Sequence, residues 1–329
     1  MSLPPFGAFR PLCRSVPSYP ICNLFTRQLF TDHREILDQY GFNQDVSGVG
    51  VNPQCAIPQA TAGAGAGQNG GGGSGLGNIA NILACGLSMV LVIFLIARCS
   101  RRKAAVGRVE LRAFLVLYLL TLPFQLLDTG ALLKQGTTHL SVLTAIHMGL
   151  IATTFWMMLA NAIVATQVVE DGTMSSLVPF YAFSLFFFAG TTYVSLDTAF
   201  TWTDAFRLGT GGASGQPIEN LTNIPLFVLT SVWPAAAAFF YFMIMSYVVL
   251  GVLREMRPFF YYFGAAFLFV LSQLGYFLLS KIVCRGTSAK LDASFAATIL
   301  EASPIRTAAV GMLYLAWRSI TEESWDEPW

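Results

Sequence analysis

Residues 79–97 read IANILACGLSMVLVIFLIA and are followed directly by RCSRRK at 98–103. The first stretch carries no charged side chain, and as an α-helix it is long enough to cross the roughly 30 Å hydrocarbon core of a bilayer. Because hydrocarbon offers the backbone no water to bond, the run is expected to be a helix. Residues 39–78 before it hold no Lys or Arg. This charge step predicts that the basic end is cytoplasmic and that the N-terminal segment is lumenal.

Similar apolar runs recur along the rest of the chain, at 79–97, 113–133, 140–167, 177–198, 225–250, 259–280 and 291–317. They predict an all-α membrane protein: a seven-transmembrane-helix bundle with a lumenal N-terminus and a cytoplasmic C-terminus. Lys281, Arg285 and Lys290 fall on the predicted lumenal side and run against this orientation, but the step at the first run is larger. The prolines within the runs, Pro123, Pro234 and Pro304, are expected to kink their helices.

Composition agrees with this interpretation. The chain is 54% hydrophobic and only 11% charged, whereas soluble domains carry about 25% charged residues. Its net charge of +1 excludes a strongly basic nucleic-acid-binding protein.

The chain divides into parts of different composition. Residues 1–60 form an N-terminal segment that contains cysteines, and 61–78 form a Gly/Ala-rich linker that cannot bury enough surface to fold. Residues 79–317 form the helix bundle, and 318–329 form a short acidic tail on the cytoplasmic side.

Two kinds of residue suit a lumenal location. The sequon Asn220-Leu221-Thr222 is a candidate glycosylation site in the loop before the fifth run. The cysteines on the predicted lumenal side are candidates for disulfides in one of three connectivities, although they are alternatively free thiols. They are Cys13, Cys22, Cys55 and Cys284.

Catalytic and metal-binding motifs are missing from the sequence. It has no HExxH, GxSxG, P-loop or CxxC pattern, so we expect no catalytic residue, no metal site and no cofactor. The unusual residues are the charges inside the apolar runs: Asp128, Glu301 and Arg306. Intramembrane charges mark either paired structural contacts, such as Asp128 with Arg306 across helices, or a transport or proton-relay site.

Several stretches follow one another in a recurring order: AVGRVEL at 105–111, LLDTG at 126–130, EDGT at 170–173, SQ at 272–273, SKIVC at 280–284, LD at 291–292, and Trp317 with SITEE at 319–323. In order and spacing they resemble the fungal chitin synthase export chaperone family. The N-terminal pattern is similar as well, with Phe6-Gly7, Cys13, Cys22 and Asn52–Cys55. Two stretches depart from the family pattern: the linker is an insertion, and Ser303–Thr307 lengthens the seventh run.

The resemblance implies a multi-pass membrane protein of the endoplasmic reticulum and not an enzyme. Such a protein binds a chitin synthase and enables its folding and export towards the cell surface, which supports cell-wall chitin synthesis. Neither a nucleic acid nor a small-molecule substrate is expected. Which chitin synthase is the client, and whether the protein travels with it or forms oligomers, stays open. The candidate partner-binding or motif residues are Arg108, Glu110, Asp128, Glu170, Asp171, Gly172, Gln273 and Glu301.

The alternative is a seven-span receptor or a protein like a lipid exporter. The turn at 168–176 and the loop at 251–258 are short, which leaves little cytoplasmic surface for receptor coupling.

The charge step around the first run generates a test of topology. A glycan at Asn220 should be removable by endoglycosidase, and a C-terminal tag should be digested when protease is added to intact microsomes. A protected C-terminal tag would overturn the predicted orientation.

Overall fold

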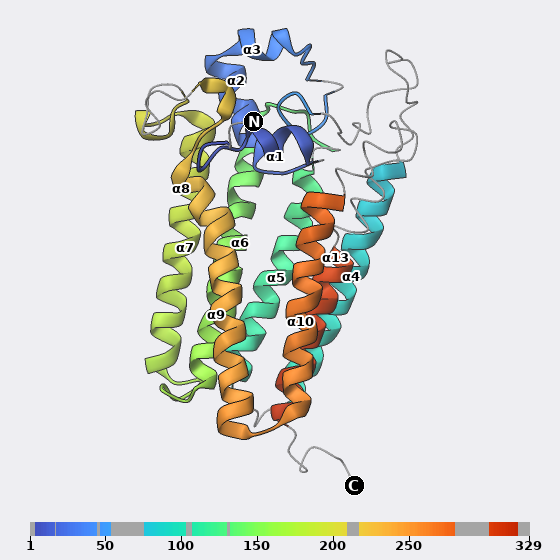
Figure 1. Ribbon diagram of the computed structural model, residues 1–329, viewed down its shortest axis with the longest axis vertical. Coiled ribbons are helices and arrows are strands. Elements are labelled where there is room, and N and C mark those ends of the chain that lie inside the picture. Colours follow the sequence, from blue (N-terminus) through green and yellow to red (C-terminus); the bar gives the residue numbers. More distant parts are fainter. Residues whose placement is uncertain are drawn as a thin grey trace.

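The computed structural model describes residues 4–16, 18–44, 47–53, 76–102, 107–129, 132–208, 217–279 and 303–321, with the backbone alone at 76–80, 279, 303 and 304. Within these residues the chain is helical, and its one extended contact is a bridge between Ala8 and Thr222. Long helices stand side by side, and short helices cover one end (Figure 1). The all-α prediction is therefore confirmed for the described residues.

The long elements are α4 (Leu76–Arg101), α5 (Arg108–Asp128), α6 (Thr138–Ala165), α7 (Met174–Phe200), α8 (Ile224–Phe227) continuing into α9 (Trp233–Tyr247), α10 (Met256–Leu274) and α13 (Ser303–Ile320). Six helices of the described chain are long and apolar enough to cross a membrane. They are Asn81–Arg101, Arg108–Asp128, Thr138–Ala165, Met174–Phe200, Ile224–Leu253 and Met256–Leu278.

The first six predicted spans correspond to these helices, whereas the seventh run lies partly outside the described residues. Its second half is α13, which packs against α10 and α4. The count of seven spans and the orientation of the termini stay predictions. Pro304 lies at the start of the described part of the seventh run, so the kink expected there stays a prediction. The predicted linker lies largely outside the described residues, and α4 already begins at Leu76, inside its predicted range.

Helix α6 is the centre of the bundle. It packs against α5, α7 and α9. In the most apolar 18-residue stretch of α6, 56% is buried inside the protein, whereas the corresponding stretch of α7 is 17% buried. The side chains that α7 leaves exposed are mostly apolar, as expected of a helix whose outer face meets lipid.

The fifth span is continuous although it contains Pro234. Proline cannot donate the hydrogen bond to the preceding turn, and a π turn at Val228–Val232 lies directly before Trp233 and Pro234. The wider turn accommodates the missing bond. The Trp233 indole then donates to the carbonyl of Ala152 at 3.1 Å, which fixes this span against α6.

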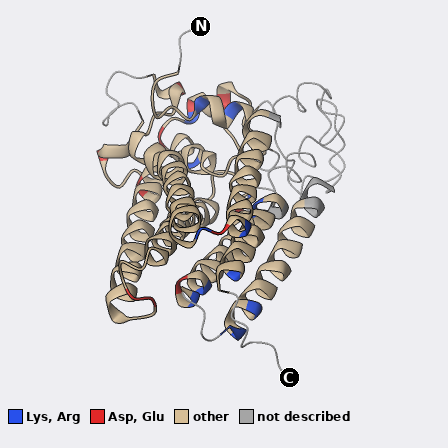
Figure 2. Cartoon of the chain, turned by 60° about the horizontal axis from the view of Figure 1, so that its bottom comes forward, with Lys and Arg blue, Asp and Glu red and all other residues tan. Residues whose placement is uncertain are grey.

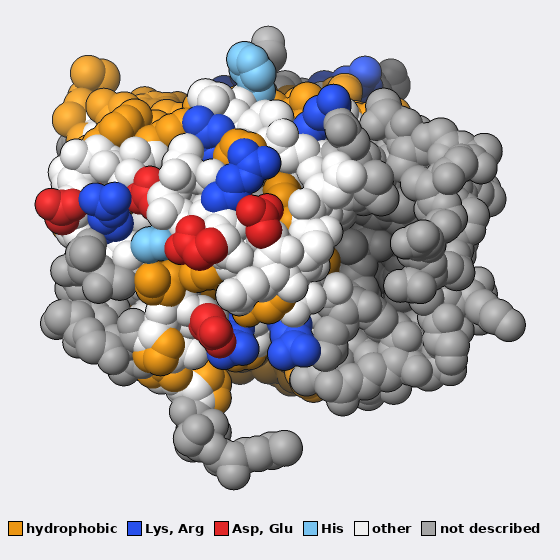
Figure 3. Space-filling model, turned by 90° about the horizontal axis from the view of Figure 1, so that it is seen from above, with side chains coloured by type: hydrophobic (Ala, Val, Ile, Leu, Met, Phe, Trp, Pro, Cys, Tyr) orange, Lys and Arg blue, Asp and Glu red, His pale blue; other side chains and the backbone are white. Residues whose placement is uncertain are grey.

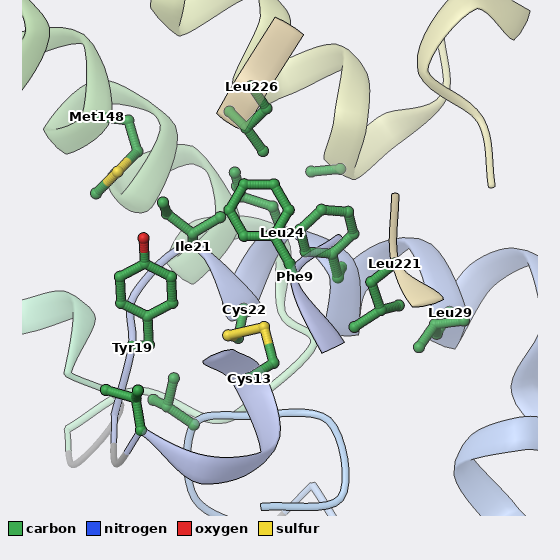
Figure 4. Packing of buried hydrophobic residues seen from close by; sticks show 14 of the residues in the cluster. Phe9, Cys13, Tyr19, Ile21, Cys22, Leu24, Leu29, Met148, Leu221 and Leu226 are labelled. Atoms are coloured by element: carbon green, nitrogen blue, oxygen red, sulfur yellow. A yellow bond between two sulfur atoms is a disulfide. The ribbon is translucent and has the colours of Figure 1, made fainter. Parts of the chain in front are cut away.

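The described residues between 4 and 53, which we call the cap, cover one end of the bundle. They form α1 (Arg10–Ser15), α2 (Cys22–Asp32) and α3 (Arg34–Gln39). Helix α2 packs against α6 and α7, and Leu24 and Leu29 join Met148 and Leu226 in one apolar cluster (Figure 4). The N-terminal segment is thus packed into the bundle end and does not form a separate core.

Residues 7–9 of the cap pair with residues 221–223, which precede the fifth span. The amide of Phe9 donates to the Leu221 carbonyl at 3.2 Å, and the amide of Asn223 donates to the Gly7 carbonyl at 3.0 Å. Viewed from this end, the cap presents interspersed basic and acidic side chains (Figure 3). These charges pair, as in Arg10 with Glu219 at 3.0 Å.

A disulfide joins Cys13 and Cys22 and closes the turn between α1 and α2. If all four cysteines on the predicted lumenal side pair, the remaining bridge joins Cys55 to Cys284. Both of these cysteines lie outside the described residues, so this second bridge stays a prediction.

The close contact between α6 and α7 can be tested at Gly149. A Cβ added there would meet the Thr192 side chain and lie 3.0 Å from the Phe188 carbonyl oxygen. Gly149→Ala should therefore lower the free energy of unfolding by about 1–3 kcal/mol, the usual cost of overpacking. Gly86→Ala is the matched control, because a Cβ on Gly86 meets nothing within 4 Å. Equal Tm values for the two variants in detergent would contradict this packing.

Candidate functional site

The LLDTG motif contains a buried carboxylate that is bonded to a buried histidine. Asp128 Oδ2, at the end of α5, lies 2.5 Å from Nδ1 of His147 on α6. The two residues are 0% and 3% exposed. A carboxylate removed from water needs such a partner, because an unpaired buried charge costs several kcal/mol.

The cap closes this contact from the lumenal side of the predicted topology. The amide nitrogen of Asn23 on α2 donates to the Asp128 carbonyl at 2.8 Å and to the Thr144 hydroxyl at 3.0 Å. Asn81 on α4 donates to the Thr129 hydroxyl at 3.2 Å. We call these residues the Asp128 cluster: Asn23, Asn81, Asp128, Thr129, Thr144 and His147. The cluster joins the cap to α4, α5 and α6.

The sequence hypothesis that Asp128 pairs with Arg306 is wrong, because the carboxylate is bonded to His147 instead. His147 could have been found from the sequence, since it lies two to three turns into the helix that follows Asp128 after a short loop. Asn23 could not, because it lies 105 positions before Asp128 and in a different part of the chain.

The AVGRVEL and EDGT motifs contact each other at the opposite end of α5. Glu110 is fully buried, and its Oε1 accepts from the Gly172 amide at 3.1 Å and from the Ser176 hydroxyl at 3.0 Å. In return, the Gly107 amide donates to Asp171 Oδ2 at 2.9 Å. We call this reciprocal contact the Glu110 clasp.

The glycines of the Glu110 clasp have a backbone conformation that other residues seldom adopt. Gly107 and Gly172 both have φ of +67°, in the left-handed region that favours glycine. This conformation turns each amide towards the carboxylate of the other motif. The clasp therefore fixes the start of α5 to the turn between α6 and α7.

The other candidate residues have no part in either contact. Glu170 is exposed and Arg108 is half-buried. The half-buried Gln273 donates to the neighbouring Ser272 hydroxyl at 3.4 Å. Asn220 ends a short helix at Ile218–Asn220, and its glycosylation stays a prediction. Glu301 lies outside the described residues.

Metal-ligating side chains do not gather anywhere in the described part of the chain. No three His, Cys, Asp or Glu residues there lie close enough to hold an ion. Two pockets lie at the cap end, one between the cap and residues 218–221 and the other within the cap. One is about 20 Å³ and includes Arg10 and Tyr40, and the other is about 300 Å³ and includes Phe30 and Arg34.

The buried pair at the centre of the Asp128 cluster generates a double-mutant test. Asp128→Leu alone and His147→Leu alone should each cost about 3–5 kcal/mol of unfolding free energy, because each leaves one buried polar partner unpaired. The double variant should cost clearly less than the sum, because it leaves neither partner. Thermal unfolding in detergent measures all three.

Asp204→Leu is the control for this cycle, since the Asp204 side chain is 85% exposed and its ion pair is at the surface. Additive losses at Asp128 and His147 would contradict the coupling.

Comparison with known proteins covers nearly the whole chain. A family model described as chitin synthase export chaperone matches residues 5–329. The chitin synthase export chaperone of Chaetomium globosum is 27% identical over 318 residues, which cover 97% of this chain and 83% of the relative. That of Candida glabrata is 23% identical over 319 residues, covering 96% and 93%.

The chitin synthase export chaperone of Phaeosphaeria nodorum is 28% identical over 237 residues, which cover 72% of this chain and 66% of the relative. No solved structure matches. The family match includes the cap, the Asp128 cluster and the Glu110 clasp. This chain therefore belongs to the chitin synthase export chaperone family.

Proposed function

We propose that this protein is a membrane chaperone of the endoplasmic reticulum that binds a chitin synthase and enables its folding and export towards the cell surface. Export of the enzyme would support cell-wall chitin synthesis. The observation that carries the proposal is the family match over residues 5–329, which includes cap and bundle together. The matched relatives are named as chaperones and not as enzymes, receptors or lipid exporters.

The buried contacts support binding rather than catalysis as the work of this chain. The Asp128 and Glu110 carboxylates are fully buried, and one oxygen of each is bonded within the protein. They hold the helices and the cap in place. Their effect on client binding would therefore be indirect, because they determine the shape of the bundle. A binder of this kind acts stoichiometrically.

Exposed or half-satisfied groups are the better candidates for client contact. Glu170 is exposed directly beside the clasped Asp171, at the bundle end predicted to be cytoplasmic. Its carboxylate would meet a basic loop of the client. Within the bundle, the amide nitrogen of Asn161 on α6 has no partner among the described residues. Such an amide could satisfy a polar group on a client span.

Deletion of the gene in the source organism is the direct test of function. A tagged chitin synthase should then stay in the endoplasmic reticulum and fail to reach the cell surface. Normal delivery of every chitin synthase would overturn the proposal.

The contact at Glu170 is tested by co-purification of tagged chitin synthase, normalised to chaperone abundance. Glu170→Lys should lower client binding per molecule severalfold, because it reverses a charge without touching the Glu110 clasp. Glu255→Lys is the matched control, since Glu255 is an exposed acid on the α9–α10 loop at the same bundle end. Asp128→Leu should lower abundance more than binding per molecule. Unchanged binding by Glu170→Lys would remove Glu170 from the client surface and leave the deletion result intact.

A further inference from the structure

Basic side chains gather where α4 and α13 end and α5 begins. In the described part of the chain they are Arg98, Arg101, Arg102, Arg108, Arg112 and Arg318. We call this group the arginine corner. Figure 2 brings this end of the bundle forward and shows basic segments clustered towards one side.

Helix contacts bring these side chains together. Helix α4 packs against both α5 and α13, and the Cys99 thiol of α4 donates to the Arg108 carbonyl at the start of α5 at 3.9 Å. The guanidinium of Arg102 also donates to the Thr321 carbonyl at 3.3 Å, which connects α4 to the end of α13. The corner is therefore one surface formed by three helices.

The arginine corner has no carboxylate partner in the described part of the chain. The ion pairs found there, other than Asp128–His147, belong to the cap and the loop segments beside it. The acid of the neighbouring motif, Glu110, is buried and bonded to Gly172 and Ser176. Within the described residues, the exposed guanidinium groups of the corner are therefore available to an anion.

Exposed apolar side chains lie one helical turn inward from the exposed arginines. Phe94 precedes Arg98, whose guanidinium lies 5.4 Å from the Phe94 ring centroid. Exposed Val116 lies one turn from Arg112, and exposed Leu315 lies one turn from Arg318. This arrangement places guanidinium groups at the border of an apolar surface, where a lipid has its headgroup and acyl chains.

We propose that the arginine corner binds the phosphorylated headgroup of an anionic membrane lipid of the phosphoinositide class. Guanidinium groups bind phosphate oxygens in a bidentate manner, which an ammonium group cannot do. Basic clusters at the cytoplasmic end of membrane helices attract such headgroups. The lipid's acyl chains would lie along Phe94, Val116 and Leu315. The test involves no chitin synthase, so its outcome is independent of the client proposal.

The experiment titrates the full-length protein in detergent with a fluorescent short-chain phosphatidylinositol bisphosphate, followed by anisotropy. Arg112→Gln/Arg318→Gln should weaken binding about 25-fold, from roughly fivefold for each arginine. The matched control is Arg254→Gln/Arg257→Gln, which removes one exposed arginine from the α9–α10 loop and another from the first turn of α10, at the same bundle end. The control should change binding by less than about twofold, and both variants should keep the wild-type Tm.

Competitors identify the ligand. Short-chain phosphatidylcholine and phosphatidylserine, soluble inositol trisphosphate and an acidic peptide should each compete more weakly than unlabelled phosphatidylinositol bisphosphate. Equal losses in the two arginine pairs would overturn the proposal, because binding would then follow overall charge. Equal competition by phosphatidylserine, by inositol trisphosphate or by the acidic peptide would overturn it as well, in favour of general charge attraction, a soluble phosphate site or a protein partner respectively.

Discussion

The bond between Asp128 and His147 is the contact on which the cap end of this protein depends. Both groups are out of water, and hydrocarbon provides no substitute partner. Their pairing brings the end of α5 against α6. The carbonyl of Asp128 then accepts a hydrogen bond from the side-chain amide of Asn23 on α2. The cap therefore lies over the bundle through polar contacts that are satisfied only when α2, α5 and α6 are all in place.

The two ends of α5 are held in the same manner by different chemistry. One end uses a histidine and an asparagine, and the other uses glycine amides bonded to Glu110 and Asp171. A helix of this length places the two contacts about 30 Å apart. Helix α5 thus connects the lumenal and cytoplasmic faces of the predicted topology. Loss of either contact would loosen the attachment of one end of this helix.

The long helices could be predicted from the sequence because span length and apolarity are local properties, visible in runs such as 140–167. The contacts between motifs could not be predicted, because they join positions far apart in the chain. Glu110 bonds to residues more than 60 positions later, and neither motif contains a signal that identifies the other as its partner. The sequence allows three connectivities for its four candidate cysteines, so it could not predict that Cys13 pairs with Cys22.

The attachment of the cap sets an order for assembly during synthesis. The cap leaves the ribosome first, yet Leu221, Asn223 and Leu226, which it packs against or bonds to, are made roughly 170 residues later, about 10–30 s at ordinary translation rates. The disulfide between Cys13 and Cys22 needs none of these partners, so it can close within the nascent cap. Phe9 and Phe25, by contrast, belong to an apolar cluster that is complete only when Leu221 and Leu226 have been made. This protein, which we propose protects another membrane protein, therefore has an incompletely packed cap during part of its own synthesis.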